Sequence, residues 1–298
     1  PTLSRLLGAD VWIKHENHQP VGAFKVRGGL NLAANLDAAT RKSGLFTAST
    51  GNHGQSIAFA ARAYGIRATI AVPNGANPGK VDAMEGLGAR VVFHGEDFDS
   101  AREWIMKEAK QAGGYFVGPT DTPLICGVGT YALEIIEDLP NVNTIIVPVG
   151  AGSGACGTAI VAKSIHPAIE VIGAQSAQAP AMQKSWSSGE MQTAPMNTFA
   201  EGVATRIPFE NTQAIMRKYL DDFLLVEDDD IKQAVALLLH HTHNLAEGAG
   251  AIPLAAALAN RERVSGKKVV LILSGGNMAL DQLHEILSNS VDPTMNHA

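Results

Sequence analysis

The sequence predicts an α/β fold, because short runs rich in β-branched residues alternate with longer stretches of helical periodicity. Such alternation is typical of parallel sheets whose strands are joined by helical crossovers. The expected strands fall in an early, compact cluster and a later, more widely spaced one: residues 45–49, 67–73 and 89–94, then 143–150, 170–175 and 268–276. A chain of 298 residues suggests one large domain or two smaller ones, and the wider spacing of the later strands suggests a second sheet.

Helices are expected between the strands of the early cluster, at about residues 53–64 and 78–87. A later segment, residues 228–248, begins with acidic residues that suit a helix N-terminus. Apolar residues recur there at helical spacing, so we expect one amphipathic helix with a single buried face: Ile231, Ala234, Val235, Leu238, Thr242 and Leu245.

Composition excludes several classes of function. The formal net charge is -6 and no stretch is rich in Lys or Arg, whereas nucleic-acid binding needs a basic face. No apolar run approaches the roughly 20 residues that span a bilayer. Cys126 and Cys156 are too few for a disulfide framework, and no basic segment followed by an apolar one opens the chain. We therefore expect a cytoplasmic enzyme that acts on a small molecule.

The segment GAFKVRGG, residues 22–29, places Lys25 between Phe24 and a pair of glycines. A lysine amine attacks carbonyl groups when its surroundings lower its pKa, and the obvious use is a Schiff base with an aldehyde cofactor. Taken alone, a lysine more often opens a helix and faces solvent. Its interpretation as a nucleophile therefore depends on the other motifs.

The segment ASTGNHGQ, residues 48–55, lies where an expected strand runs into a helix. Its two glycines permit close approach to the backbone, and four side chains offer hydrogen-bond donors: Ser49, Thr50, Asn52 and His53. Because a helix N-terminus attracts anions, the turn suits a carboxylate, although a polar turn that merely caps a helix fits these residues equally well.

The segment VPVGAGSGACG, residues 147–157, again combines a strand, a glycine turn and a helix, which suits a loop whose N–H groups cradle a phosphate. Gly152, Gly154 and Gly157 also satisfy G-x-G-x-x-G, the dinucleotide fingerprint of NAD-dependent dehydrogenases. Such sites require an acidic residue at the end of the next strand, where this chain has Gln175. The dehydrogenase is therefore a remote alternative.

Together these segments resemble the fold type II pyridoxal-phosphate enzymes, the family of the tryptophan synthase β-subunit, and within it the serine/threonine dehydratase and serine racemase branch. The resemblance covers nearly the whole chain and rests on motifs in the family's order: KHEN leading to GAFKVRGG, STGNHGQ, PVGAGSG, FAEGVA, EGAGA and LSGGN. It implies a tryptophan synthase β-subunit-like fold, with a large cofactor-binding domain of residues 1–42 and 122–298 and a small mobile domain of residues 43–121. Family members carry a further segment upstream of the position of Pro1, so we expect one here.

The resemblance implies pyridoxal 5'-phosphate as cofactor and assigns roles to single residues. Lys25 is then the Schiff-base lysine, Phe24 packs beside the cofactor, and Asn52 hydrogen-bonds the pyridoxal 3-oxygen. Ser274 becomes the partner of the pyridine nitrogen, and the phosphate loop is formed by Gly150, Ala151, Gly152, Ser153 and Gly154. The substrate is bound by Ser49, Thr50, Gly51, Asn52 and His53.

No metal is expected. In the racemase branch a divalent cation is held by a glutamate, a backbone carbonyl and an aspartate, and the matching positions here are Gln175, Ala179 and Ala181. Both carboxylates are missing, and with them most of the attraction for such an ion. His240 and His243, at i,i+3 spacing, form a candidate pair with no clear further ligand.

The activity implied is that of a dehydratase (ammonia-lyase) that converts a β-hydroxy amino acid, L-threonine or L-serine, to a 2-oxo acid and ammonia, in a homodimer without nucleic-acid or membrane partners. Lys25 removes the Cα proton, and the neutral Ser274 favours elimination over a long-lived carbanion. Thr50 stands where the racemase branch has a serine that reprotonates the opposite face, so we expect racemisation to be minor.

Three further alternatives stay open besides the dehydrogenase. They are a lyase for hydroxyaspartate or phenylserine, an amino-acid racemase, and a catalytically silent protein that binds the cofactor. The side-chain preference is not decided by the motifs, because residues scattered along the chain form the walls of a pocket.

Overall fold

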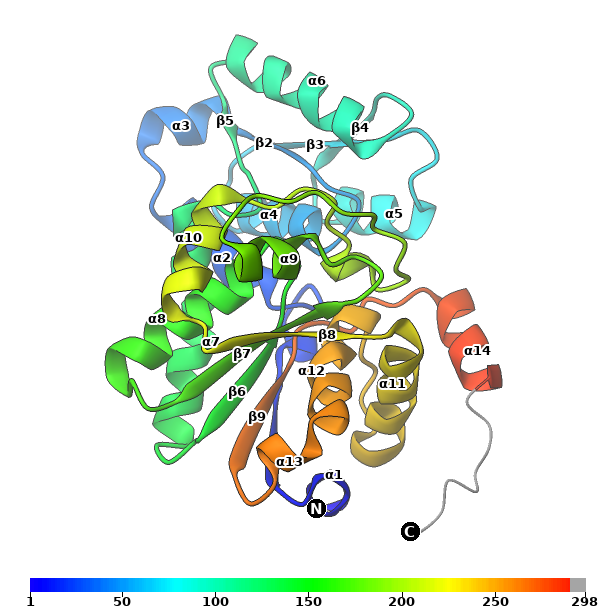
Figure 1. The fold of residues 1–298 in the computed structure, drawn as a ribbon. Coiled ribbons are helices and arrows are strands. Elements are labelled where there is room, and N and C mark those ends of the chain that lie inside the picture. The colour runs from blue at the N-terminus through cyan, green and yellow to red at the C-terminus, as the bar shows by residue number, and fades with distance from the viewer. Residues whose placement is uncertain (290–298) are drawn as a thin grey trace. The chain divides into compact units, whose positions relative to one another are not determined.

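The protein has the expected α/β fold in a computed structural model that describes residues 1–289, and every strand pairing among these residues is parallel (Figure 1). The chain divides into two compact units, named here unit 1 (Pro1–His18 with the described residues from Tyr131 onward) and unit 2 (Gln19–Thr130). Unit 2 begins before residue 43 because helix α2 (Lys25–Ala34) packs on helix α4 (Asn52–Ala63). The expected mobile domain of residues 43–121 stays a prediction.

Unit 1 is built on a five-stranded sheet in the order β1-β9-β6-β7-β8. Its strands are β1 (Asp10–His15), β6 (Thr144–Pro148), β7 (Glu170–Ser176), β8 (Asp222–Val226) and β9 (Lys268–Leu273). Its helices are α1 (Thr2–Leu7), η1 (Glu16–His18), the later part of α7 (Thr122–Asp138), α8 (Ser153–Ile165), α9 (Ala181–Ser188), η2 (Glu201–Val203), α10 (Glu210–Tyr219), α11 (Asp228–Thr242), α12 (Gly248–Ala259), α13 (Arg261–Val264) and α14 (Leu280–Asn289).

The direction of the chain across this sheet reverses beside β6. From β6 the chain moves outward through α8 to β7 and on to β8, and it returns through α11 and α12 to β9, on the other side of β6. Right-handed crossovers that run in opposite directions place their helices on opposite faces, as Figure 1 shows for α8 and α12. The carboxyl ends of β6 and β9 therefore meet at the switch point where open α/β sheets bind ligands.

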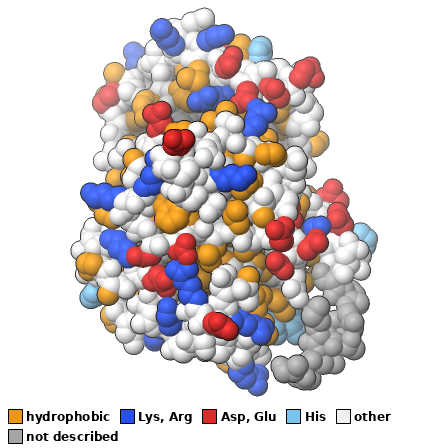
Figure 2. Space-filling model, in the orientation of Figure 1, with side chains coloured by type: hydrophobic (Ala, Val, Ile, Leu, Met, Phe, Trp, Pro, Cys, Tyr) orange, Lys and Arg blue, Asp and Glu red, His pale blue; other side chains and the backbone are white. Residues whose placement is uncertain are grey.

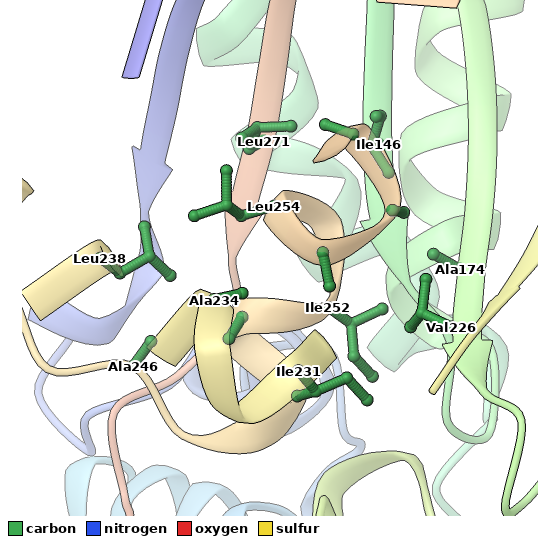
Figure 3. Close-up of a cluster of buried hydrophobic side chains, with 14 of the residues drawn as sticks. Ile146, Ala174, Val226, Ile231, Ala234, Leu238, Ala246, Ile252, Leu254 and Leu271 are labelled. Carbon is green, nitrogen blue, oxygen red and sulfur yellow. The ribbon is translucent and has the colours of Figure 1, made fainter. Parts of the chain in front are cut away.

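The core of unit 1 lies between this sheet and the pair α11 and α12 (Figure 3). Ile146 and Leu271 extend from the sheet toward Leu254 of α12, and Ile231 and Leu238 reach the same cluster from α11. Burying each such side chain contributes about 1.5–3 kcal/mol. Helices α11 and α12 are thus fixed on the sheet, and with them the loop that joins them.

Unit 2 is built on a four-stranded sheet in the order β4-β3-β2-β5. Its strands are β2 (Leu45–Ala48), β3 (Ala68–Val72), β4 (Arg90–Phe93) and β5 (Tyr115–Phe116), and its helices are α2, α3 (Ala38–Ser43), α4, α5 (Pro78–Gly86), α6 (Phe98–Gln111) and the start of α7. Alternate residues of a strand face opposite sides, so Ile70 and Val72 join the cluster under α4, whereas Ala71 joins the one under α6.

The sequence missed three strands, and all three lie at sheet edges. They are β1 and β8 in unit 1 and the two-residue β5 in unit 2. Edge strands carry more polar residues because one side has no neighbouring strand, and β1 (DVWIKH) contains no fully buried residue. The sequence signal was therefore weak for β1 and for the two-residue β5, whereas β8 (DFLLV) does contain an apolar run and was missed in spite of it.

The expected helix over residues 228–248 is shorter than predicted. Helix α11 ends at Thr242, because His243 adopts a left-handed conformation with φ 56° that ends the helix. Ile231, Ala234, Val235 and Leu238 are buried as expected, but Leu245 lies beyond the helix. The candidate pair of His240 and His243 also loses its helical spacing.

The surface agrees with the charge balance of the sequence. Figure 2 shows acidic and basic side chains interspersed over the face in view, without an extended basic area. Within residues 1–289, no helix is both long and apolar enough to cross a membrane.

Candidate active site

Lys25 is the first residue of α2, directly after Phe24 at the helix N-cap. Its Nζ lies 5.1 Å from the centroid of the Phe24 ring, and its side chain is partly buried. Burial removes water from the ammonium group and lowers the pKa of Lys25 from 10.5 to about 8. An appreciable fraction of this amine is therefore neutral near physiological pH, as a nucleophile or a base must be.

The two glycines after Lys25 are explained by close packing. A Cβ atom on Gly28 would lie 2.8 Å from the backbone oxygen of Leu124, and one on Gly29 would lie 2.5 Å from Ser56 Oγ. The same Ser56 hydroxyl donates a hydrogen bond of 2.6 Å to the backbone oxygen of Lys25. The glycines thus let α2 approach its neighbours closely enough for α4 to hold the start of the lysine helix.

The turn of residues 49–52 connects β2 to α4 at the carboxyl edge of the sheet of unit 2. Buried Ser49 accepts a hydrogen bond of 3.2 Å from the N–H of Gly51 through its hydroxyl oxygen. A side chain on Gly54 would lie 2.5 Å from Met84 Sδ, whereas one on Gly51 would meet no atom within 4 Å. Gly54 is therefore explained by packing, and Gly51 leaves open space in front of the helix N-terminus.

His53 is buried behind this turn as a neutral imidazole. Its Nε2 lies 3.0 Å from Thr47 Oγ1 and 3.3 Å from the backbone oxygen of Val117. A carbonyl oxygen only accepts, so Nε2 carries the proton and Nδ1 is the acceptor nitrogen. Burial, followed by the positive charge of Lys25, lowers the pKa of His53 to about 4. These contacts are with the protein itself, and the role of His53 in substrate binding stays a prediction.

The glycine loop of residues 150–154 leads from β6 into α8. Gly152 is the N-cap of α8 with φ 99°, a conformation that favours glycine, and a Cβ there would lie 2.9 Å from Thr212 Cβ. The Thr212 hydroxyl donates to the backbone oxygen of Ala151 at 2.7 Å, and the Tyr131 hydroxyl donates to that of Gly154 at 3.1 Å. Side chains of unit 1 thus fix the backbone at both ends of the loop.

Ser274 follows β9 directly and is 4% exposed. Because β9 pairs with β6 in parallel, Ser274 and the glycine loop follow neighbouring strands at the same edge of the sheet. A Cβ on Gly250 would lie 2.6 Å from the backbone oxygen of Gly275, which also accepts a hydrogen bond of 3.0 Å from the N–H of Glu247. The EGAGA and LSGGN motifs are therefore in direct contact.

These residues fit pyridoxal phosphate. The N–H groups at the start of the 13-residue helix α8 suit a phosphate dianion, and the glycines leave their approach open. The lowered pKa of Lys25 suits reaction with an aldehyde. By contrast, residues 1–289 contain no group of three or more His, Cys, Asp or Glu side chains that could hold a metal ion.

The structure also identifies supporting residues that the motifs did not reveal. Ser56 holds Lys25, Thr47 and Val117 fix the tautomer of His53, and Thr212 holds the glycine loop. Ser56 follows Asn52 by one helical turn, which was the one signal available in the sequence. Thr212 lies 61 residues from Ala151 along the chain, and Thr47 is one residue of an ordinary buried strand, so neither had a signal in the sequence.

Comparison with known proteins gave matches over almost the whole chain. The sequence profile of a family described as pyridoxal-phosphate dependent enzyme matches residues 1–275. An L-threonine ammonia-lyase of Thermotoga maritima is 38% identical over 97% of this chain and 72% of its own length. Among solved structures, threonine deaminase isoform 2 from Solanum lycopersicum superposes with a TM-score of 0.93 at 33% identity, covering 96% of this chain and 85% of that one. Serine racemase from Dictyostelium discoideum superposes with a TM-score of 0.88 at 35% identity, covering 94% of this chain and 91% of that one.

Proposed function

This chain belongs to the pyridoxal-phosphate-dependent enzymes, and from that premise we propose that it is an ammonia-lyase that converts L-threonine or L-serine to a 2-oxo acid and ammonia. Its relatives at 36–38% identity are named as threonine ammonia-lyases or dehydratases. The single observation that carries the proposal is Lys25, a partly buried lysine with a pKa of about 8 at the start of α2, within the family's motif.

Pyridoxal phosphate supplies an electron sink that makes the Cα proton of a bound amino acid acidic. In unit 1, the N–H groups of Gly152, Ser153 and Gly154 would hold its phosphate, and Ser274 would face its ring nitrogen. The neutral hydroxyl of Ser274 would not hold a proton on the ring nitrogen as a carboxylate would, so the ring would be a weaker electron sink, which favours early loss of the β-hydroxyl. In unit 2, Phe24 and Asn52 would contact the ring.

The chain's own residues then move the proton and bind the substrate. The neutral Lys25 amine is the base that removes the Cα proton. The turn of residues 49–53 offers N–H groups and hydroxyls at the N-terminus of α4, which suits the substrate carboxylate. Thr50 and Asn52 are only partly buried and Gly51 faces open space, so a ligand can approach this turn.

The decisive experiment is a screen of purified protein for ammonia release from β-hydroxy amino acids. We expect L-threonine and L-serine to give 2-oxobutyrate and pyruvate, and hydroxyaspartate or phenylserine to react poorly. Lys25→Ala should lower turnover by about three orders of magnitude or more, since nucleophile and base are lost together. Lys42→Ala, a change at an exposed lysine in α3, is the matched control. Wild-type-like turnover by purified Lys25→Ala would refute the proposal.

A racemase is the second candidate, because the serine racemase of Dictyostelium discoideum shares 35% identity and the fold. A catalytically silent binder would absorb visible light through the bound cofactor yet release no 2-oxo acid from any substrate in the screen. The dehydrogenase is set aside because the family match covers the glycine loop.

Assembly, location and domain motion belong to the same proposal. We propose a homodimer in the cytoplasm, in which residues 43–121 form a small mobile domain. The two cysteines, both free in the structure, are consistent with a reducing compartment. Light scattering on purified protein would measure the mass of the assembly, and a monomer at micromolar concentration would contradict the dimer.

A further inference from the structure

Gln175 has a fully buried side chain at the carboxyl end of β7, with 0% exposure. Its Oε1 accepts a hydrogen bond of 3.2 Å from the N–H of Gln183 in the first turn of α9. Its Nε2 donates to Thr205 Oγ1 at 3.2 Å and to the backbone oxygen of Val203 at 3.4 Å. One carboxamide therefore joins β7 to both α9 and the segment of residues 201–205, which begins with η2.

Both of the elements that Gln175 holds lie against the glycine loop. A Cβ atom on Gly150 would collide with the backbone oxygen of Gly202 in η2. A Cβ atom on Gly152 would lie 3.4 Å from the terminal methyl group of Met182 in α9. The loop thus contacts two separate elements, and Gln175 fixes both relative to the sheet.

The chemistry of this position requires an amide. The Val203 carbonyl can only accept a hydrogen bond and the Gln183 N–H can only donate one, so the side chain between them must offer a donor at one end and an acceptor at the other. A glutamate of the same length keeps the acceptor but, when ionised, places a negative charge against the Val203 oxygen in a buried site. No other uncharged side chain of this length supplies both functions.

We propose that Gln175 is a positioning residue for the glycine loop, and that through α9 and η2 it sets the affinity of the loop for the cofactor phosphate. The proposal rests on the proposed function in one respect, namely that the loop binds the phosphate of pyridoxal phosphate. Weakening the three hydrogen bonds lets α9 and η2 move, and the loop then loses preorganised N–H donors. Gln175 itself touches no reacting atom, so its loss changes cofactor binding before it changes chemistry.

The test is a titration of cofactor-free protein with pyridoxal phosphate, followed by visible absorption. In Gln175→Glu, we expect the dissociation constant to rise by about tenfold or more, because two donated hydrogen bonds are lost in a buried site. Once saturated, the variant should keep a near-normal KM for the amino acid. The matched control is Gln178→Ala, since Gln178 accepts from the Asp228 N–H at 3.0 Å and so serves α11 instead of the loop.

A second measurement separates positioning from general stability. If Gln175 were purely structural, its replacement would lower the melting temperature of cofactor-free protein but leave unchanged the increase in melting temperature that the cofactor produces. The proposal requires that this increase be smaller in Gln175→Glu and unchanged in Gln178→Ala. If Gln175→Glu does not fold by circular dichroism, Thr205→Val removes one acceptor and should weaken cofactor binding in the same direction. A wild-type dissociation constant in the folded variant overturns the proposal. Wild-type protein that binds no pyridoxal phosphate would instead refute the proposed function.

Discussion

Ser56 Oγ donates a 2.6 Å hydrogen bond to the backbone oxygen of Lys25. Ser56 lies one helical turn after Asn52 in α4, so this bond connects the start of the lysine helix to the helix that begins at the STGNHG turn. The contact is close enough that a Cβ atom on Gly29 would lie 2.5 Å from the same hydroxyl. In unit 2, therefore, the backbone of the proposed reactive lysine is fixed by the helix that carries the proposed substrate-binding turn.

Ser56→Ala should reduce both stability and turnover. Loss of the hydrogen bond leaves the Lys25 carbonyl without this donor, at a cost of about 0.5–1.5 kcal/mol in the free energy of unfolding. Turnover should fall further than this stability loss implies, because the lysine helix is less firmly placed. The control is Ser43→Ala, whose hydroxyl donates to the Ala39 backbone oxygen at 3.1 Å on an exposed helix. Equal kcat values in the two variants would contradict the prediction.

The rate at which cofactor-free protein takes up pyridoxal phosphate should rise with pH. Only the neutral amine reacts with an aldehyde, and burial lowers the pKa of Lys25 to about 8. The midpoint of the rise should therefore lie near pH 8, well below that of an exposed lysine. Stopped-flow absorption measures the rate, and a midpoint at or above pH 10 would show that Lys25 is not desolvated in solution.

The same lowered pKa predicts how stability depends on pH. Between the folded value of about 8 and the unfolded value of 10.5, the unfolded chain binds more protons, so the contribution of Lys25 to stability rises with pH in this window. Below pH 8, the full free-energy cost of burying the charged Lys25 ammonium group destabilises the folded protein. Cofactor-free Lys25→Met should therefore unfold at higher urea concentration than wild type at pH 7, and the difference should shrink toward pH 10.5. A difference that does not vary with pH would contradict this.

Racemisation should be minor beside elimination. Thr50 carries a β-methyl group that fixes its hydroxyl rotamer and crowds the face on which a second proton would be delivered. Chiral chromatography of residual L-serine during turnover measures both processes. D-Serine that accumulates as fast as pyruvate would refute the prediction, and Thr50→Ser is the variant expected to raise the D-serine yield.

Divalent cations should have no effect on the wild-type enzyme. Gln175 and Ala181 replace the two carboxylates expected of a cation site, and the Gln175 amide already donates to Thr205 and Val203. Dialysis against EDTA should leave activity unchanged, with or without added magnesium. Gln175→Glu is the variant to compare with wild type, because it places a carboxylate beside the Val203 backbone oxygen and Thr205 Oγ1. Its melting temperature should therefore respond to magnesium. Activity lost from wild type on chelation and restored by the metal would reveal other ligands.

The sequence alone predicted the α/β class and most buried strands, because a strand covered on both faces must be a continuous apolar run. It also marked Lys25, the ASTGNHGQ turn and the glycine loop, since glycines at a strand-to-helix turn leave a local signature. Edge strands such as β1, and the end of α11 at His243, had no comparable signal. Their limits depend on neighbours that are remote in the chain.

The tertiary structure alone decided which residues support those motifs. Ser56 lies 31 residues after Lys25, Thr212 lies 61 after Ala151, and Val203 and Thr205 lie 28 and 30 after Gln175. A serine, a threonine or a glutamine is polar wherever it occurs, and its sequence neighbours do not tell whether it faces water or a buried carbonyl. That choice is made only when the helices pack on the sheets, because a buried polar atom must then find a partner among whichever groups the fold brings within hydrogen-bond distance.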